Sequence, residues 1–228
     1  MIFIGGLAAC FVGSSLAQPN PSSEQEALSY VKVAAERAGK IVANLGLSDG
    51  DQASRVREVI AIHYSALRAI HDPRDAQIKA IKAASGNADS KASAIQRVRD
   101  EADLKLYQLH FEFVARLSAE LSSEQVEKVK NGLTYGVLPL TYRGYQEMYP
   151  LLSDAQKKQL LAWLTEAREH AMDGGSSEEK HSWFGKYKGR INNYLSAAGF
   201  DAKKAEADLN SRQKTGAGNS DPAHTSPP

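Results

Sequence analysis

Apolar residues recur at three- and four-residue spacing along most of the chain, which is the spacing of one face of an α-helix. The first segment shows it with Leu28, Val31, Ala38, Ile41 and Leu45. The same period returns after Ser48 and after Ser90, and no stretch alternates apolar and polar residues for long enough to predict a strand. We therefore expect an all-α fold.

Serine caps mark the starts of several of these helices. Ser122 with Gln125, and Ser153 with Gln156, have the spacing of a capping box, and Ser176 precedes Glu179 by the same three residues. Helices joined by such short polar turns bury their apolar faces against one another. The expected architecture is a single-domain helical bundle of about seven helices over residues 18–215.

Two segments are expected to interrupt the helical pattern. Asp72-Pro73 is predicted to end one helix and begin the next, because proline is accepted at the first helical position. The stretch from 131 to 150 contains Gly136, Pro139, Gly144 and Pro150, so we expect its tyrosines to lie partly on loops. From residue 216 to 228 the composition predicts a disordered tail.

The N-terminus has the pattern of an export signal. Residues 1–12 carry no charge, and Ser15 and Ala17 are small residues at the positions that a signal peptidase reads, so we predict a signal peptide over 1–17. The apolar run is shorter than the roughly 20 residues that a membrane span needs, so no stable transmembrane anchor is expected. The expected location is periplasmic or extracellular, and a lipoprotein lipidated at Cys10 is the alternative.

Composition narrows the chemistry. The 228 residues carry a formal net charge of +1, which gives no global attraction to nucleic acid. A single cysteine excludes an internal disulfide and a multi-cysteine metal site. The chain has no HExxH, GxSxG, glycine-rich phosphate loop or calcium loop, so we expect no cofactor and no metal. The oligomeric state is left open.

Ten aromatic residues fall between residues 131 and 200, which places the expected binding surface there. Tyrosine combines an apolar ring face with a hydroxyl, a combination suited to stacking on a sugar ring or to gripping a peptide. The same tyrosines could equally cover the end of the bundle. The predicted ligand contacts are Tyr135, Tyr142, Tyr145, Trp183, Lys186, Lys188, Arg190 and Asn192.

Two glycines sit within the helix predicted from Ser176 to about Ala198. Gly185 and Gly189 each cost about 1 kcal/mol relative to alanine in a helix interior. We expect either another helix or a ligand to approach the bare strip that they create.

Acid and base groups gather at the end of the preceding helix. Glu166, His170 and Asp173 fall on one helical face, and the Gly174-Gly175 turn would bring His181 near them. Such a set suits acid–base catalysis, with these four residues as candidates, although charge at a helix end is also typical of a solvated face. The other histidines of the helical stripes, His63, His71 and His110, are expected to be packing or capping groups.

The block KHSWFGKYKGRINNYL, which begins at Lys180, resembles an uncharacterised family of secreted bacterial all-helical domains. The resemblance extends over roughly residues 26–207; it implies export and a helical fold, implies no activity, and favours a carbohydrate ligand. The sequences LSSEQ at Leu121 and LSDAQ at Leu152 are also similar to the LTxxQ repeat of Spy-type periplasmic chaperones, which implies polypeptide binding. Helix capping is the alternative explanation of that repeat.

We therefore expect an exported, non-catalytic protein that binds a carbohydrate or glycan fragment through its C-terminal aromatic and basic surface. The alternatives are a hydrolase or lyase acting on polysaccharide and a polypeptide-binding chaperone of the LTxxQ type.

Overall fold

The structure, a computed structural model, describes residues 21–217, and every regular element in that range is an α-helix. The all-α prediction is therefore confirmed. The predicted signal peptide, Cys10 and residues 218–228 of the predicted tail lie outside the described residues. None of the described helices is long and apolar enough to cross a membrane. The helices are α1 (Pro21–Val42), α2 (Gly50–Ala83), α3 (Ala88–Glu120), α4 (Ser123–Leu133), α5 (Val137–Met148), α6 (Asp154–Met172), α7 (Ser177–Ala197) and α8 (Ala202–Ala217).

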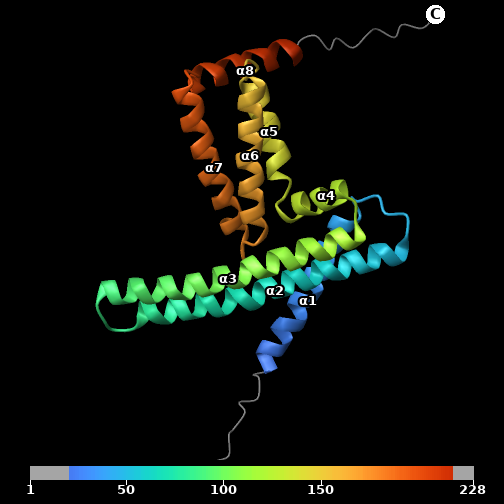
Figure 1. Cartoon of the computed structure of the whole chain (residues 1–228), viewed down its shortest axis with the longest axis vertical. Coiled ribbons are helices and arrows are strands. Elements are labelled where there is room, and N and C mark those ends of the chain that lie inside the picture. The colour runs from blue at the N-terminus through green and yellow to red at the C-terminus, as the bar shows by residue number, and fades with distance from the viewer. Residues whose placement is uncertain (1–20, 218–228) are drawn as a thin grey trace, which may run out of the picture.

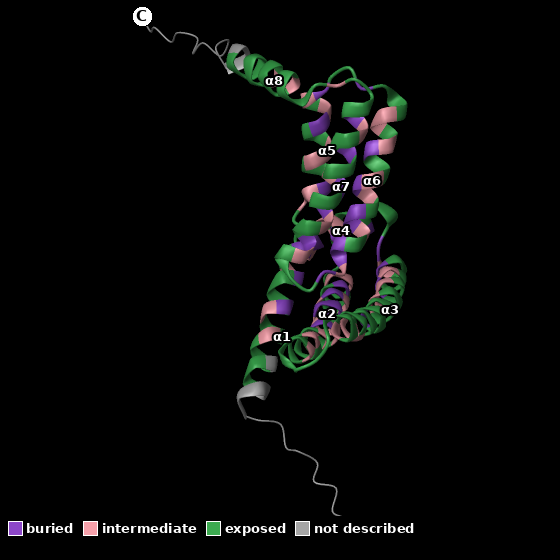
Figure 2. Ribbon diagram, turned by 90° about the vertical axis from the view of Figure 1, so that its left-hand side faces the viewer, coloured by how far each residue is buried: buried purple, intermediate pink, exposed green. Residues whose placement is uncertain are grey.

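The long α2–α3 hairpin is the base of the molecule. Helix α1 crosses it on one side, while α5, α6 and α7 stand upright on it and α8 lies across their far end (Figure 1). Helix α4 links the hairpin to the upright helices, and buried positions follow the inward faces of both groups (Figure 2).

Two apolar cores result from this arrangement. Helices α1 to α4 enclose the first core, with Ile60, Leu117 and Val129 at its centre. Helices α5, α6 and α7 enclose the second, which includes Leu164 and Ile191. The turn from α6 to α7 lies where the two groups meet.

The predicted caps are present. Ser122 with Gln125 forms a complete capping box at α4, and Ser153 with Gln156 forms one at α6. Ser176 accepts a hydrogen bond from the backbone N–H of Glu179 and caps α7. Each LSxxQ sequence thus places its serine and glutamine in helix capping.

The break predicted at Pro73 is wrong, because α2 continues through it. Proline removes one backbone hydrogen bond and disfavours a helix interior by about 3 kcal/mol. Packing on both sides of the proline outweighs that cost: Leu67 and His71 are buried before it, and Ile78 and Ile81 are half-buried after it.

The tyrosine-rich segment is interrupted as expected, but most of it is helical. Tyr135 and Gly136 have φ of 57° and 68° and form the turn between α4 and α5. Pro139 lies in the first turn of α5, where a backbone N–H has no partner within the helix. Tyr142 and Tyr145 therefore sit on a helix, which corrects the expectation that they lie on a loop.

Candidate functional site

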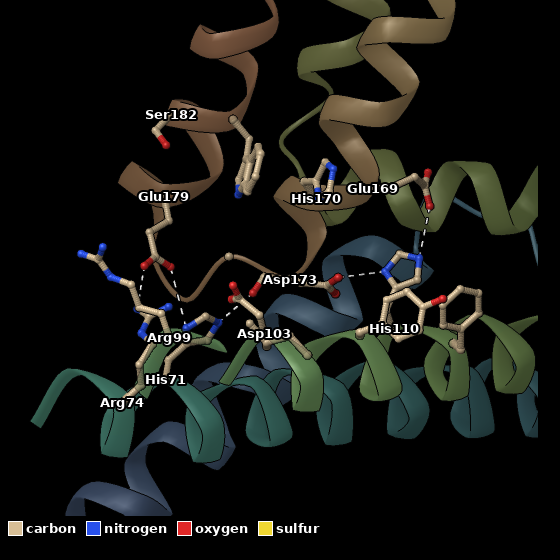
Figure 3. Close-up of a pocket in the computed structure, with 15 residues that line it drawn as sticks. His71, Arg74, Arg99, Asp103, His110, Glu169, His170, Asp173, Glu179 and Ser182 are labelled. Carbon is tan, nitrogen blue, oxygen red and sulfur yellow. Dashed lines mark hydrogen bonds and ion pairs between the residues drawn. The ribbon is translucent and has the colours of Figure 1, made fainter. Parts of the chain in front are cut away.

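A cavity of about 900 Å³ opens between the α2–α3 hairpin and the lower ends of α6 and α7 (Figure 3). Both halves of the chain contribute its walls. They consist of His71 and Arg74 from α2; Arg99, Asp103, Leu106, Tyr107, His110 and Phe111 from α3; and Glu169, His170, Asp173, Gly174, Glu179, Ser182 and Trp183 from α6, α7 and their turn.

Two histidines hold Asp173, the C-cap residue of α6. His71 donates from Nε2 to the backbone carbonyl of Asp173 at 2.7 Å. His110 contacts the Asp173 carboxylate through Nδ1, 2.9 Å from Oδ2. Because His71 belongs to α2 and His110 to α3, Asp173 is fixed by both helices of the hairpin, and we call these three residues the histidine clamp.

The turn after the clamp requires a glycine. A Cβ added to Gly175 would lie 2.5 Å from Cγ of His71, closer than carbon atoms can approach. The backbone N–H of Gly175 donates to the Glu179 carboxylate at 2.7 Å, and Arg74 reaches the same carboxylate at 2.6 Å. The α6–α7 turn is thus seated directly on the imidazole of His71.

His110 is a cation at neutral pH. Hydrogen bonding to Asp173 and Glu169 raises its pKa to about 9, because both carboxylates favour the protonated ring against the opposing effect of burial. Its Nε2 lies 3.5 Å from Glu169, so carboxylates flank the imidazolium on both sides. A ring held in this way supplies positive charge and has no free nitrogen to act as a base.

Glu169 belongs to a larger ionic network behind the cavity. Burial alone would raise its pKa, but His110, Lys130 and Arg168 hold it at about 2. Lys130 donates to it at 2.8 Å, and the fully buried Arg168 donates to it at 2.9 Å. Arg168 also reaches Glu127 at 2.7 Å, so every charge in this network has a partner.

Two further polar side chains are buried beside the clamp. His63 stacks on Phe113 with 3.8 Å between ring centroids, neither of its ring nitrogens has a hydrogen-bond partner, and burial lowers its pKa to about 3. Lys180 donates to the carbonyl of Leu133 at 2.9 Å, and burial lowers its pKa to about 8. His63 is therefore a neutral core residue at physiological pH.

Aromatic rings face the cavity from α3. Tyr107 and Phe111 line it and remain 64% and 56% exposed, and their rings contact each other edge to face at 4.7 Å. On the opposite wall, Trp183 stacks on His170 at 4.3 Å, with the Lys186 ammonium 4.9 Å from the indole centroid.

Arg99 and Asp103 add unpaired charges to the same wall as Tyr107. Both are exposed, and neither makes an ion pair with any residue in the described range 21–217. No group of three His, Cys, Asp or Glu side chains among those residues is placed to hold a metal ion.

The residues predicted from the sequence divide between the cavity and other places. Of the four acid–base candidates, His170 and Asp173 line the cavity. His181 instead stacks on Tyr135 at 5.6 Å, outside the cavity lining, and Glu166 lies 4.0 Å from Arg190 on an exposed face. The four candidates therefore do not converge in one pocket.

The predicted ligand contacts divide in the same way, and only Trp183 among them lines the cavity. Tyr145 is buried, with its hydroxyl donating to Asn192 at 2.8 Å and oriented toward the Lys188 carbonyl at 3.4 Å. Tyr142 packs half-buried against the second core, and Arg190 lies over Trp163 rather than over Trp183.

The glycine strip on α7 is open. Apart from the neighbouring backbone of α7 itself, no described atom lies within 4 Å of a Cβ added at Gly185 or Gly189, so no other helix of the described chain approaches them closely.

The α3 wall is the part of the site that the sequence pattern did not identify. Arg99, Asp103, Tyr107 and Phe111 follow one another at four-residue spacing along one side of the helix. The sequence feature that could have identified this wall is the aromatic pair Tyr107 and Phe111, because both residues lie off the apolar stripe that packs α3 into the core.

Comparison with known proteins identifies a family and no curated relative. The family described as "Protein of unknown function (DUF3826)" matches residues 31–215. No curated protein matches the chain.

Proposed function

The chain belongs to this family of unknown function, and we propose from its own cavity that it is an exported protein that binds a carbohydrate or glycan fragment. The ligand occupies the space between the α2–α3 hairpin and the lower ends of α6 and α7. The protein acts by binding and not by catalysis.

The observation that carries this proposal is the exposed pair Tyr107 and Phe111 within the cavity. Large aromatic side chains are normally buried, and two that remain exposed on the wall of a cavity are typical of a binding site. A sugar ring presents C–H groups that pack on an aromatic face.

The remaining walls suit the hydroxyl groups of a sugar. The carboxylates of Asp103 and Glu169 can accept hydrogen bonds from these hydroxyl groups, and the guanidinium group of Arg99 can donate hydrogen bonds to them. Ser182 and His170 offer further hydrogen-bond partners on the opposite side. The clamp and the ionic network fix the walls before any ligand arrives, which reduces the entropy lost on binding.

Calorimetric titration with a panel of neutral and acidic oligosaccharides tests the proposal. We expect saturable binding of at least one, and about a tenfold loss of affinity in Tyr107→Ala and in Phe111→Ala, as expected when one aromatic contact is lost. Leu104→Ala is the matched control, because Leu104 is 61% exposed on the same helix but outside the cavity lining. Absence of heat with every sugar, or an equal loss in the control, would overturn the proposal.

A hydrolase or lyase acting on the same ligand is the second candidate. The observation that favours it is the presence of His170 and Asp173 together in the cavity. It predicts the release of reducing ends or of an unsaturated sugar from a polysaccharide, and the loss of that release in His170→Ala. Polysaccharide that binds and is recovered intact contradicts this candidate.

A further inference from the structure

The α2–α3 hairpin extends well beyond the helices that stand on it (Figure 1). We call residues 76–99, which form this end, the hairpin arm. Its half-buried apolar residues, Ile78, Ile81, Ile95 and Val98, lie at helical spacing on the two helices of the hairpin and suit the seam between α2 and α3. The outer surface of the arm is therefore free of any packing role within the fold.

Cationic side chains outnumber carboxylates on this arm. Within residues 76–99 there are five cationic side chains and the single carboxylate of Asp89, a net charge of +4, whereas the whole chain carries only +1. The cations are Lys79, Lys82, Lys91, Arg97 and Arg99.

These cations are not used to stabilise the fold. None of the five makes an ion pair with another residue between 21 and 217, and four of them are exposed. Lys91, which is half-buried, donates only to the backbone carbonyl of Lys82. Concentrated unpaired charge of one sign attracts an oppositely charged partner at ordinary ionic strength.

Arg99 connects the arm with the cavity. It is the last cation of the arm along α3 and at the same time a residue of the cavity wall, one helical turn before Asp103.

We infer that the hairpin arm binds an anionic polysaccharide and brings part of it to the cavity. The choice of a polysaccharide among polyanions rests on the proposed function, whereas the attraction of a polyanion rests on the arm alone.

One observation favours a polysaccharide over a single-stranded nucleic acid. The arm contains no aromatic residue, and proteins that bind single-stranded nucleic acids combine basic charge with aromatic rings on which bases stack.

Retardation of the folded protein in gels that contain alginate, a polyuronate, tests the inference. The test variant carries Lys79→Gln, Lys82→Gln and Arg97→Gln, and it keeps Arg99 because that residue lines the cavity. The control variant loses the same charge elsewhere, through Lys40→Gln, Lys203→Gln and Lys204→Gln, all exposed positions on α1 and α8.

We expect the arm variant to bind alginate about tenfold more weakly than the natural chain at low salt, and the difference to disappear at about 0.5 M salt because exposed charges are then screened. The control variant and gels with uncharged dextran should show no such loss. Equal retardation of the natural and arm-variant chains, or equal weakening in the control, overturns the inference. Tighter arm-dependent binding of single-stranded DNA than of alginate overturns it in favour of a nucleic acid.

The outcome is separable from that of the proposed function. Tyr107→Ala tests the cavity and leaves the charge of the arm unchanged. If retardation depends on the arm but Tyr107→Ala does not affect oligosaccharide binding, the proposed ligand site in the cavity is contradicted and polyanion binding by the arm is supported. If Tyr107→Ala weakens oligosaccharide binding but retardation does not depend on the arm, only the inference about the arm is contradicted.

Discussion

Replacing His110 by glutamine should destabilise the protein in a pH-dependent way. In the folded chain His110 is cationic between Asp173 and Glu169, and its pKa is raised from 6.5 to about 9. In the unfolded chain the two carboxylates are no longer held beside it, and the imidazole titrates near 6.5. Glutamine fills a similar space and can donate one hydrogen bond, but it carries no charge.

The size of the effect follows from the raised pKa. At about 1.4 kcal/mol for each pH unit, the difference between 6.5 and about 9 corresponds to about 3 kcal/mol of folding free energy. Because the folded-state pKa is the higher one, this contribution is fully present below pH 6.5 and is lost as the pH rises through 9. The natural chain should exceed His110→Gln in stability by up to about 3 kcal/mol at pH 6 and by much less at pH 9.5.

Urea unfolding followed by circular dichroism at several pH values between 6 and 9.5 measures this difference. Lys180, whose pKa is lowered to about 8, adds a stability change of opposite sign, but it does so in both proteins and cancels in the comparison. His181→Gln is the control, since His181 is exposed and stacks on Tyr135. A difference between the natural chain and His110→Gln that stays constant across this range would refute the proposed charge on His110.

Three other substitutions test the packing and the buried charge described above. Gly175→Ala should lower the free energy of unfolding by about 2 kcal/mol, because the added Cβ would overlap His71. Gly185→Ala should raise it by about 0.5–1 kcal/mol, because the added Cβ enters open space in a helix interior. Thermal unfolding of both variants compares them directly. His63→Leu should reduce the loss of stability on acidification. The natural chain loses stability as the pH falls from 6.5 toward 3, because His63 is protonated in the unfolded chain but stays neutral when buried in the folded chain. Acid titration of both proteins measures this loss, and parallel stability curves would show that the reasoning is wrong.

The helix starts could be predicted because capping is local. Ser122 and Gln125 are three residues apart, and the hydrogen bonds they make lie within the same helical turn. Pro73 shows the limit of such reasoning. Its cost is also local, but the packing that overcomes it comes from other parts of the chain, including α3 and the α6–α7 turn.

The site was predictable only where its residues are close in sequence. His170 and Asp173 were identified as candidates because they end one helix, and both line the cavity. The opposite wall, with Arg99 and Tyr107, comes from α3, roughly seventy residues earlier in the chain, and only the fold brings it there. Tyr145 failed as a ligand contact for a related reason, since a tyrosine hydroxyl finds a buried partner as readily as an external one, and here it donates to Asn192.

The emission of Trp183 during a titration with oligosaccharide tests the central claim most directly, namely that the cavity holds the ligand. The chain has two tryptophans, and Trp163→Phe leaves Trp183 as the reporter on the cavity wall. We predict a saturable change in its emission with the same dissociation constant that calorimetry gives, and a dissociation constant about tenfold higher when Tyr107→Ala is added. Binding detected by calorimetry while the emission of Trp183 stays constant at every ligand concentration would contradict the claim.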